Sequence, residues 1–149
     1  MRILIGSDHA GFELKNALAA QLSSVGHYVV DVGPYEYDSE DDYPEYVASV
    51  AEQVGSSLGE DRGIVIGGSG QGEAMAANRF DEVRAAVYYG GNLDIVRLSR
   101  EHNDSNVLSL GARFLTAEEA WEAVVLWLAT RFSEDERHER RNEELDELT

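Results

Sequence analysis

Short apolar runs alternate along the chain with longer segments in which apolar residues recur every three or four positions. We expect each short run to form a buried β-strand, and these runs lie at 2–6, 27–32, 64–66, 84–89 and 106–110. The longer segments have the spacing of amphipathic helices. In the first of them Leu14, Leu18, Leu22 and Val25 share one helical face, and Gly26 follows as a stop.

Residues that favour helix starts mark two further helices. Pro44 suits the first turn of a helix capped by Asp42 or Tyr43, and Thr116 suits the cap of a helix that runs through Leu128. Other helices are predicted over 74–78, 93–100 and, in the charged tail, 133–148.

The alternation of strands with helices indicates an α/β protein. The strands are continuous apolar runs, as in a parallel sheet that is covered on both faces. We therefore predict one domain over 1–149, with a Rossmann-like, doubly wound, five-stranded parallel sheet and a helical tail over 133–149. Such sheets bind ligands beyond the carboxyl ends of their strands.

Composition narrows the possible functions. The chain has 149 residues, which fits one domain, and it has no cysteine for disulfides, thiolate catalysis or cysteine-zinc sites. No apolar run approaches the ~20 residues of a membrane span, and the N-terminus is not a signal peptide, so we expect a cytoplasmic protein. The formal net charge is −17 and Lys15 is the only lysine. This acidic surface disfavours nucleic acid and anionic membrane as partners.

The segment IVIGGSGQGEAMAAN, from Ile64 to Asn78, is the first candidate site. A strand-like run leads into four glycines, and then a helix begins. Glycines leave backbone N–H groups open at a helix N-terminus, where they can stabilise negative charge. The spacing is neither a P-loop nor a dinucleotide fingerprint. A tight turn alone would need only two of the glycines, so a binding loop is favoured.

Glu73 directly follows that loop and poses a problem for simple anion binding. It could be a helix-start acid stabilised by the helix dipole. Alternatively, the loop stabilises an oxyanion that exists only during a reaction, and Glu73 is the base that removes a proton beside a carbonyl.

Two histidine segments are further candidates, each with a plain structural alternative. Asp8 and His9 follow the first strand, where Asp8 could cap a helix or the pair could face a ligand. Their spacing does not suit a metal, and we expect none. His102 stands before Asn103 near a predicted helix end, where the helix dipole alone would favour an imidazole.

The tail carries the densest positive cluster of this acidic chain. Arg137 and Arg141 are spaced i,i+4, where like charges repel, and His138 lies beside them. An arginine pair suits a phosphate. The alternative is a solvated helix with ion pairs such as Glu136–Arg140.

Five motifs in order show that the chain resembles the ribose-5-phosphate isomerase type B, or LacAB, family of sugar-phosphate isomerases. They are SDHAGFELK, DYPEY, GGSGQGEAMAANR, REHNDSNVLSLGAR and RHERR, and together they span nearly the whole chain. The resemblance implies a Rossmann-like fold, no metal or organic cofactor, and a dimer or tetramer. It also implies a place in carbohydrate metabolism, in the pentose phosphate pathway if the substrate is ribose 5-phosphate. One branch of the family has a cysteine base at the position of Gly67; the other has a glutamate at the position of Glu73.

The resemblance also implies roles for individual residues. Glu73 would be the base, His102 the acid for ring opening, and Asp8 an assistant at the anomeric hydroxyl. Ser69 and its loop would hold the reacting oxygens, and the remaining contacts would bind the sugar or its phosphate: His9, Tyr43, Gly68, Gly70, Gln71, Gly72, Asn103, Arg113, Arg137, His138 and Arg141.

The predicted function is aldose–ketose isomerisation of a phosphorylated sugar, with ribose 5-phosphate and ribulose 5-phosphate as the first choice. Alternatives are a galactose, allose or tetrose phosphate, a flavodoxin-like binding module without turnover, and a serine hydrolase on Ser69. Glu73 and Asp8 follow strands, whereas His102 precedes one, so they should lie at opposite edges of the sheet. We therefore expect active sites shared between subunits, with the tail packed on a neighbouring subunit.

Overall fold

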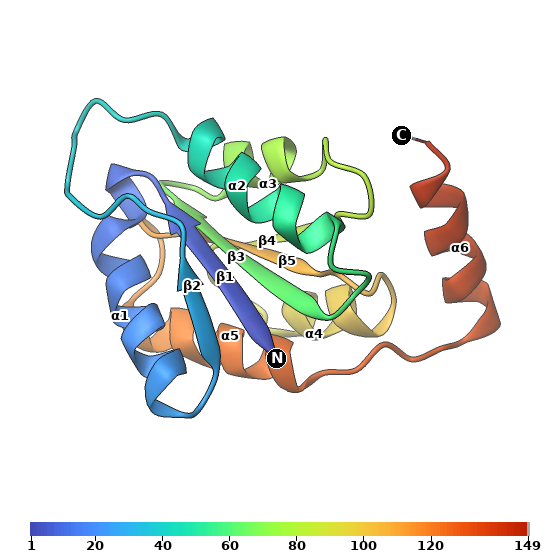
Figure 1. Ribbon diagram of the computed structural model, residues 1–149. Coiled ribbons are helices and arrows are strands. Elements are labelled where there is room, and N and C mark those ends of the chain that lie inside the picture. Colours follow the sequence, from blue (N-terminus) through green and yellow to red (C-terminus); the bar gives the residue numbers. More distant parts are fainter. Residues whose placement is uncertain (149) are drawn as a thin grey trace.

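The computed structural model describes residues 1–148, in which a parallel sheet lies between two layers of helices (Figure 1). Its strands lie in the order β2-β1-β3-β5-β4, and each neighbouring pair is parallel. The predicted doubly wound, five-stranded α/β fold is confirmed. The strands are β1 Arg2–Ser7, β2 Tyr28–Asp31, β3 Asp61–Gly67, β4 Ala85–Tyr88 and β5 Val107–Gly111.

Helices cover both faces of the sheet, and one helix stands apart. Helices α1, α4 and α5 pack on one face, and α2 and α3 pack on the other. Helix α6 follows an extended segment and lies at the side of the molecule (Figure 1). The bounds are α1 Phe12–Ser24, α2 Tyr43–Gly55, α3 Gln71–Ala77, α4 Asp94–Glu101, α5 Ala117–Ala129 and α6 Glu136–Asp146, with a short 3₁₀ helix, η1, at His9–Gly11. No helix within residues 1–148 is both long and apolar enough to cross a membrane.

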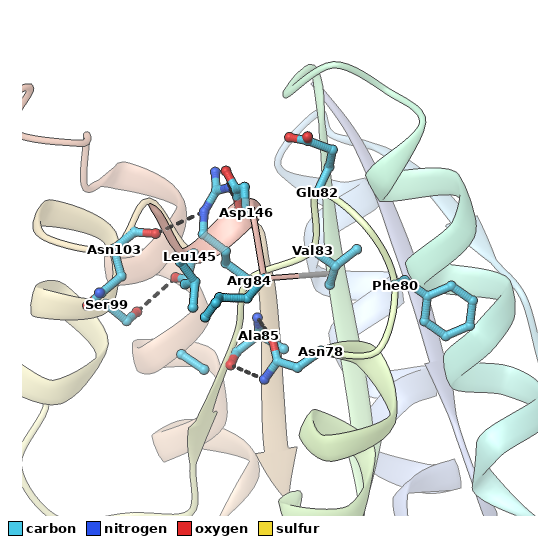
Figure 2. Close-up of a pocket in the computed structure, with 13 residues that line it drawn as sticks. Asn78, Phe80, Glu82, Val83, Arg84, Ala85, Ser99, Asn103, Leu145 and Asp146 are labelled. Carbon is cyan, nitrogen blue, oxygen red and sulfur yellow. Dashed lines mark hydrogen bonds and ion pairs between the residues drawn. The ribbon is translucent and has the colours of Figure 1, made fainter. Parts of the chain in front are cut away.

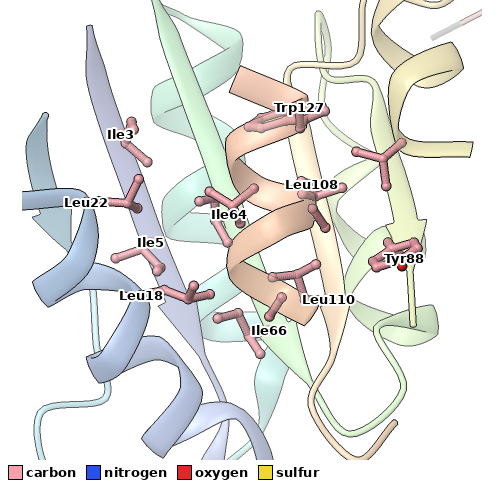
Figure 3. Packing of buried hydrophobic residues seen from close by; sticks show 14 residues of the cluster. Ile3, Ile5, Leu18, Leu22, Ile64, Ile66, Tyr88, Leu108, Leu110 and Trp127 are labelled. Atoms are coloured by element: carbon pink, nitrogen blue, oxygen red, sulfur yellow. The ribbon is translucent and has the colours of Figure 1, made fainter. Parts of the chain in front are cut away.

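The pleat of each strand divides its apolar side chains between two cores. Ile3 and Ile5 of β1 join the cluster under α1 and α5, where Trp127 is fully buried (Figure 3). Leu4, between them, joins the opposite cluster with Val50 of α2. Because successive side chains point to opposite faces and both faces are covered, the strand sequences are continuously apolar.

Some local predictions need correction. Val25 is 60% exposed, because α1 ends at Ser24 and the chain turns away from the core there. In α6, Arg140 pairs with Glu144 rather than with Glu136. The predicted cap at Thr116 is confirmed as a capping box with Glu119.

The strand order places a topological switch between β1 and β3. The chain runs from β1 to β2 on one side and then crosses to β3 on the other. Crossovers on opposite sides leave a crevice beyond the carboxyl ends of the two strands, which is where open α/β sheets bind ligands. The segments that begin at Asp8 and at Gly68 leave the sheet at this point.

Candidate active site

The loop after β3 turns sharply into α3. Gly70 caps α3 with φ 76°, a left-handed conformation that favours glycine. The Ser109 hydroxyl donates a 2.6 Å hydrogen bond to the Gly70 carbonyl and fixes the turn to β5. The loop is therefore held by the neighbouring strand, with its backbone at the carboxyl edge of the sheet.

Glu73, in the first turn of α3, folds back onto this loop. Its side chain is buried, with 4% of the residue exposed. A Cβ built on Gly67 would lie 1.7 Å from Glu73 Oε1, so only glycine leaves room for the carboxylate. Burial raises the pKa of Glu73, the negative charge of Asp8 raises it further, and the backbone N–H groups of Glu73 and Gly70 oppose the rise. A raised pKa lets this carboxylate hold a proton more readily than an exposed glutamate does, as a group that accepts and returns a proton requires.

Asp8 and His9 lie beside this carboxylate at the end of β1. Asp8 Oδ1 accepts hydrogen bonds from the backbone N–H groups of Ala10 at 2.9 Å and Gly11 at 3.2 Å. Asp8 therefore does cap a helix, η1, while its charge still acts on Glu73. Both the backbone N–H and the Nδ1 atom of His9 bind Oδ1 of Asp41, at 2.9 and 2.7 Å.

Two of the loop glycines, because they have no side chain, leave room for large side chains from other elements to pack against the loop. A Cβ on Gly72 would lie 2.5 Å from the hydroxyl of Tyr43, at the start of α2. A Cβ on Gly68 would lie 3.2 Å from Nη1 of Arg113, after β5. Tyr43 and Arg113 thus reach the loop, and their role in substrate binding stays a prediction.

The Ser69 hydroxyl forms a hydrogen bond within the glycine loop. The backbone N–H of Gln71 donates to Ser69 Oγ at 3.3 Å. Within the part of the chain that the structure describes, no histidine is hydrogen-bonded to this hydroxyl. The geometry gives no support to a serine hydrolase.

A second group of candidate residues gathers around His102. His102 follows α4, and its ring stacks on that of His138 from α6, with 4.2 Å between the centroids. Burial lowers the pKa of His138, and the positive charges of His102, Arg137 and Arg141 add to this effect. Arg137 and Arg141 themselves are exposed on α6.

Arg84, which directly precedes β4, links the segment that contains His102 and Asn103 to α6 by hydrogen bonds. Its Nε donates to the carbonyl of Asn103 at 3.1 Å, and its Nη1 donates to both carboxylate oxygens of Asp146 in α6, at 3.0 and 2.9 Å. A cavity of about 590 Å³ opens beside these residues, and Figure 2 shows Leu145 of α6 and Phe80 among the side chains that line it.

One chain does not bring the two groups together. Glu73 and Asp8 follow the carboxyl ends of β3 and β1, whereas His102 and Asn103 precede the amino end of β5. A five-residue strand such as β5 separates its ends by roughly 17 Å. Each chain therefore presents two separate groups of candidate residues, which we call the loop half-site at one edge and the α6 half-site at the other.

Two residues with evident roles at these half-sites were missed by the sequence analysis. Asp41 holds His9, and Arg84 holds the Asn103 segment to α6. Asp41 is one of several acids in the sequence YDSEDDYPEY, and no spacing distinguishes it. Arg84 stands at the start of a predicted strand, and its partners are 19 to 62 residues away.

Fold and site geometry define a doubly wound α/β protein whose crevice holds a buried carboxylate over a glycine loop. The family model described as Ribose/Galactose Isomerase matches residues 3–145. The chain belongs to this family, and it is an aldose–ketose isomerase, as predicted.

Relatives and solved structures agree with this assignment over the full fold. Ribose-5-phosphate isomerase B of Mycolicibacterium paratuberculosis is 40% identical over 141 residues, 95% of this chain and 87% of that protein. The enzyme of the same name from Escherichia coli K12 is 41% identical over 143 residues, 95% of this chain and 92% of that protein. The crystal structure of ribose-5-phosphate isomerase B from Mycoplasma genitalium with bound ribulose-5-phosphate is 37% identical, with a TM-score of 0.94 over 99% of this chain and 95% of that one.

Proposed function

We propose that the protein interconverts ribose 5-phosphate and ribulose 5-phosphate, with Glu73 as the base that moves the proton. The observation that carries the proposal is the buried Glu73 carboxylate, which lies against Gly67 in the glycine loop. The choice of sugar is supported by the names of the relatives and by the ribulose-5-phosphate bound in the M. genitalium structure.

The chemistry is a proton transfer between adjacent carbons. Ionised Glu73 removes the proton from C2 of the open-chain aldose, and the C–H electron pair moves to form the C1–C2 double bond of an enediolate. The backbone N–H groups of the loop around Gly70 stabilise the negative oxygen. The proton of the C2 hydroxyl passes to the oxygen on C1, and protonated Glu73 then returns its proton to C1 as the C2 carbonyl forms, which gives the ketose and restores the ionised base.

Ring opening precedes this transfer and needs an acid at the ring oxygen. His102 is our candidate, supplied by a second subunit because the chain's own His102 lies at the other edge of the sheet. Asp8 assists at the anomeric hydroxyl through Oδ2, which accepts no hydrogen bond within residues 1–148. Asn103, beside His102, contacts the sugar from the same side.

The phosphate is bound by arginines from both half-sites. Arg113 reaches the loop half-site, while Arg137 and Arg141 are exposed on α6 and have no ion pair within the described residues. Arg137→Ala and Arg141→Ala should each raise KM about tenfold or more, because a charge-assisted hydrogen bond contributes roughly 1.5–3 kcal/mol. Arg140→Ala is the matched control, because Arg140 pairs with Glu144.

The proposed functional unit is a dimer or larger assembly in which α6 packs on a neighbouring subunit. A two-fold dimer would form two equivalent sites, each with the loop of one chain and the His102 and α6 half-site of the other. The cytoplasmic location remains a prediction from the sequence.

A turnover screen tests the substrate. The purified protein would be given ribose 5-phosphate, an aldotetrose phosphate, galactose and allose 6-phosphates, and unphosphorylated ribose. We expect the highest kcat/KM on ribose 5-phosphate and none detectable on ribose. A higher value on another sugar phosphate would reassign the substrate, equal turnover of ribose would refute the phosphate site, and no turnover would leave a binding module.

A further inference from the structure

The segment between β2 and α2, residues 33–42, has no role in the reaction as described so far, yet it is fixed at both ends. At its start, the ammonium of the fully buried Lys15 binds Asp31, at 2.8 and 2.6 Å, and the carbonyl of Pro34 at 2.9 Å. At its end, Asp41 binds His9. A loop anchored in this way can hold a side chain in a set position.

Asp41 holds His9 at two points with a single oxygen. Oδ1 accepts from the His9 backbone N–H and contacts Nδ1, and the Asp41 side chain is 6% exposed. The other oxygen, Oδ2, is buried and accepts no hydrogen bond within residues 1–148. Tyr46 of α2 also faces this carboxylate: burial raises the pKa of the Tyr46 hydroxyl, and the negative charge of Asp41 adds to the rise.

The ring of His9 has one free edge. Nδ1 and Nε2 lie on opposite sides of an imidazole, so Nε2 faces away from Asp41, and the side chain is 27% exposed. The edge of Tyr37 packs against the ring from the loop, with 6.4 Å between centroids. The ring is therefore fixed on one side and open on the other.

The charges that face His9 come from three elements. Asp41 belongs to the loop and Asp8 to the end of β1, and both favour the imidazolium form, whereas Arg113 from the segment after β5 opposes it. The hydrogen bond to Asp41 is the largest cause of the raised pKa of His9. His9 thus lies near Arg113, which itself reaches Gly68 of the loop, and two such basic groups suit a ligand anion.

We propose that Asp41 is a positioning residue that fixes the His9 ring and keeps it charged, so that Nε2–H donates to the phosphate of the substrate. The inference rests on the proposed sugar-phosphate isomerase function. It places His9 at the phosphate as a fourth cation beside Arg113, Arg137 and Arg141, and it adds the carboxylate that orients the His9 ring. Asp41 itself does not contact the substrate.

The test compares Asp41→Asn with Asp38→Asn. Asp38 is an exposed acid on the same loop whose side chain accepts a hydrogen bond from the nearby Glu40 N–H. We expect Asp41→Asn to lower the pKa of His9, read by NMR among only four histidines. It should raise KM for ribose 5-phosphate about tenfold at pH 8 and much less at pH 6, because a lower pH favours the charged imidazole even without Asp41. The kcat should change less than KM, and Asp38→Asn should match the wild type at both pH values.

A KM ratio that is the same at pH 6 and pH 8 would overturn the proposal, as would an unchanged His9 pKa in Asp41→Asn. If Asp41→Asn does not fold, inorganic phosphate titrated into the wild type provides the test. Phosphate should shift the NMR resonance of His9 and raise the pKa of His9. No response of His9 to phosphate would overturn the proposal. The NMR results do not depend on turnover, so they separate a failure of this proposal from a failure of the proposed reaction.

Discussion

The carboxylate of Glu73 occupies the volume that a side chain on Gly67 would need, with Oε1 1.7 Å from the ideal Cβ position. A side chain at position 67, such as the cysteine that the family resemblance implies for its other branch, cannot coexist with the present position of Glu73.

Gly67→Ala should therefore displace Glu73 and lower kcat by ~10²-fold, the scale of a lost general base. Overpacking should also lower stability by about 1–3 kcal/mol. In a Glu73→Ala background the same glycine substitution should cost little, because the clash is gone. A double-mutant cycle of urea unfolding measures this coupling, and additive stability changes would contradict the contact.

The raised pKa of Glu73 predicts an unusual pH dependence. The base must be ionised, so the acid limb of kcat/KM should have its midpoint above the ordinary glutamate value of 4.5. Asp8→Asn removes a negative neighbour and should move that limb to lower pH, whatever happens to the plateau. If the acid limb of kcat/KM stays at the same pH in Asp8→Asn, Asp8 does not contribute to the raised pKa of Glu73.

The same shift has a consequence for stability, since the folded protein binds this proton more tightly than the unfolded chain does. The contribution of Glu73 is favourable below pH 4.5 and is lost as the pH rises through the folded pKa. Glu73→Gln should therefore raise Tm at pH 7 and not at pH 4.

Lys15 provides a test of the loop anchor. Its side chain is fully buried, whereas the Asp31 side chain is 32% exposed. Lys15→Met should lower the free energy of unfolding by about 3 kcal/mol, the low end for a broken buried pair, because water can still reach Asp31. Adding Asp31→Asn to Lys15→Met should restore part of the lost free energy of unfolding, because the unpaired carboxylate is then removed. Unfolding in urea measures both, and a Lys15→Met variant as stable as wild type would show that the anchor contributes nothing.

Much of the fold could be predicted, because hydrophobic periodicity and turn residues are local signals. The positions of Glu73 and Asp8 at one edge and His102 at the other also follow from strand order alone. The buried Lys15 could not be predicted, because its burial depends on Asp31 and Pro34 of another element. Asp41 was missed for the same reason: its partner, His9, is 32 residues away.

Shared sites can be tested by mixing two inactive variants, Glu73→Gln and His102→Ala. In a mixed dimer one site would combine an intact Glu73 with an intact His102, and the other would have neither. Random exchange of subunits should then restore about a quarter of wild-type activity. Exchange demonstrated by mass spectrometry without any recovery would contradict sites that span two subunits.

The most direct measurement is turnover of ribose 5-phosphate in deuterated water by the wild type and by Glu73→Gln. Glutamine keeps the shape of the buried side chain and removes its ability to accept the proton. The proton held by Glu73 should exchange with solvent before it is returned, so the wild type should form ribulose 5-phosphate that carries solvent deuterium at C1. Glu73→Gln should bind the substrate, with its turnover reduced ~10²-fold or more. Near-normal turnover by Glu73→Gln would contradict Glu73 as the base.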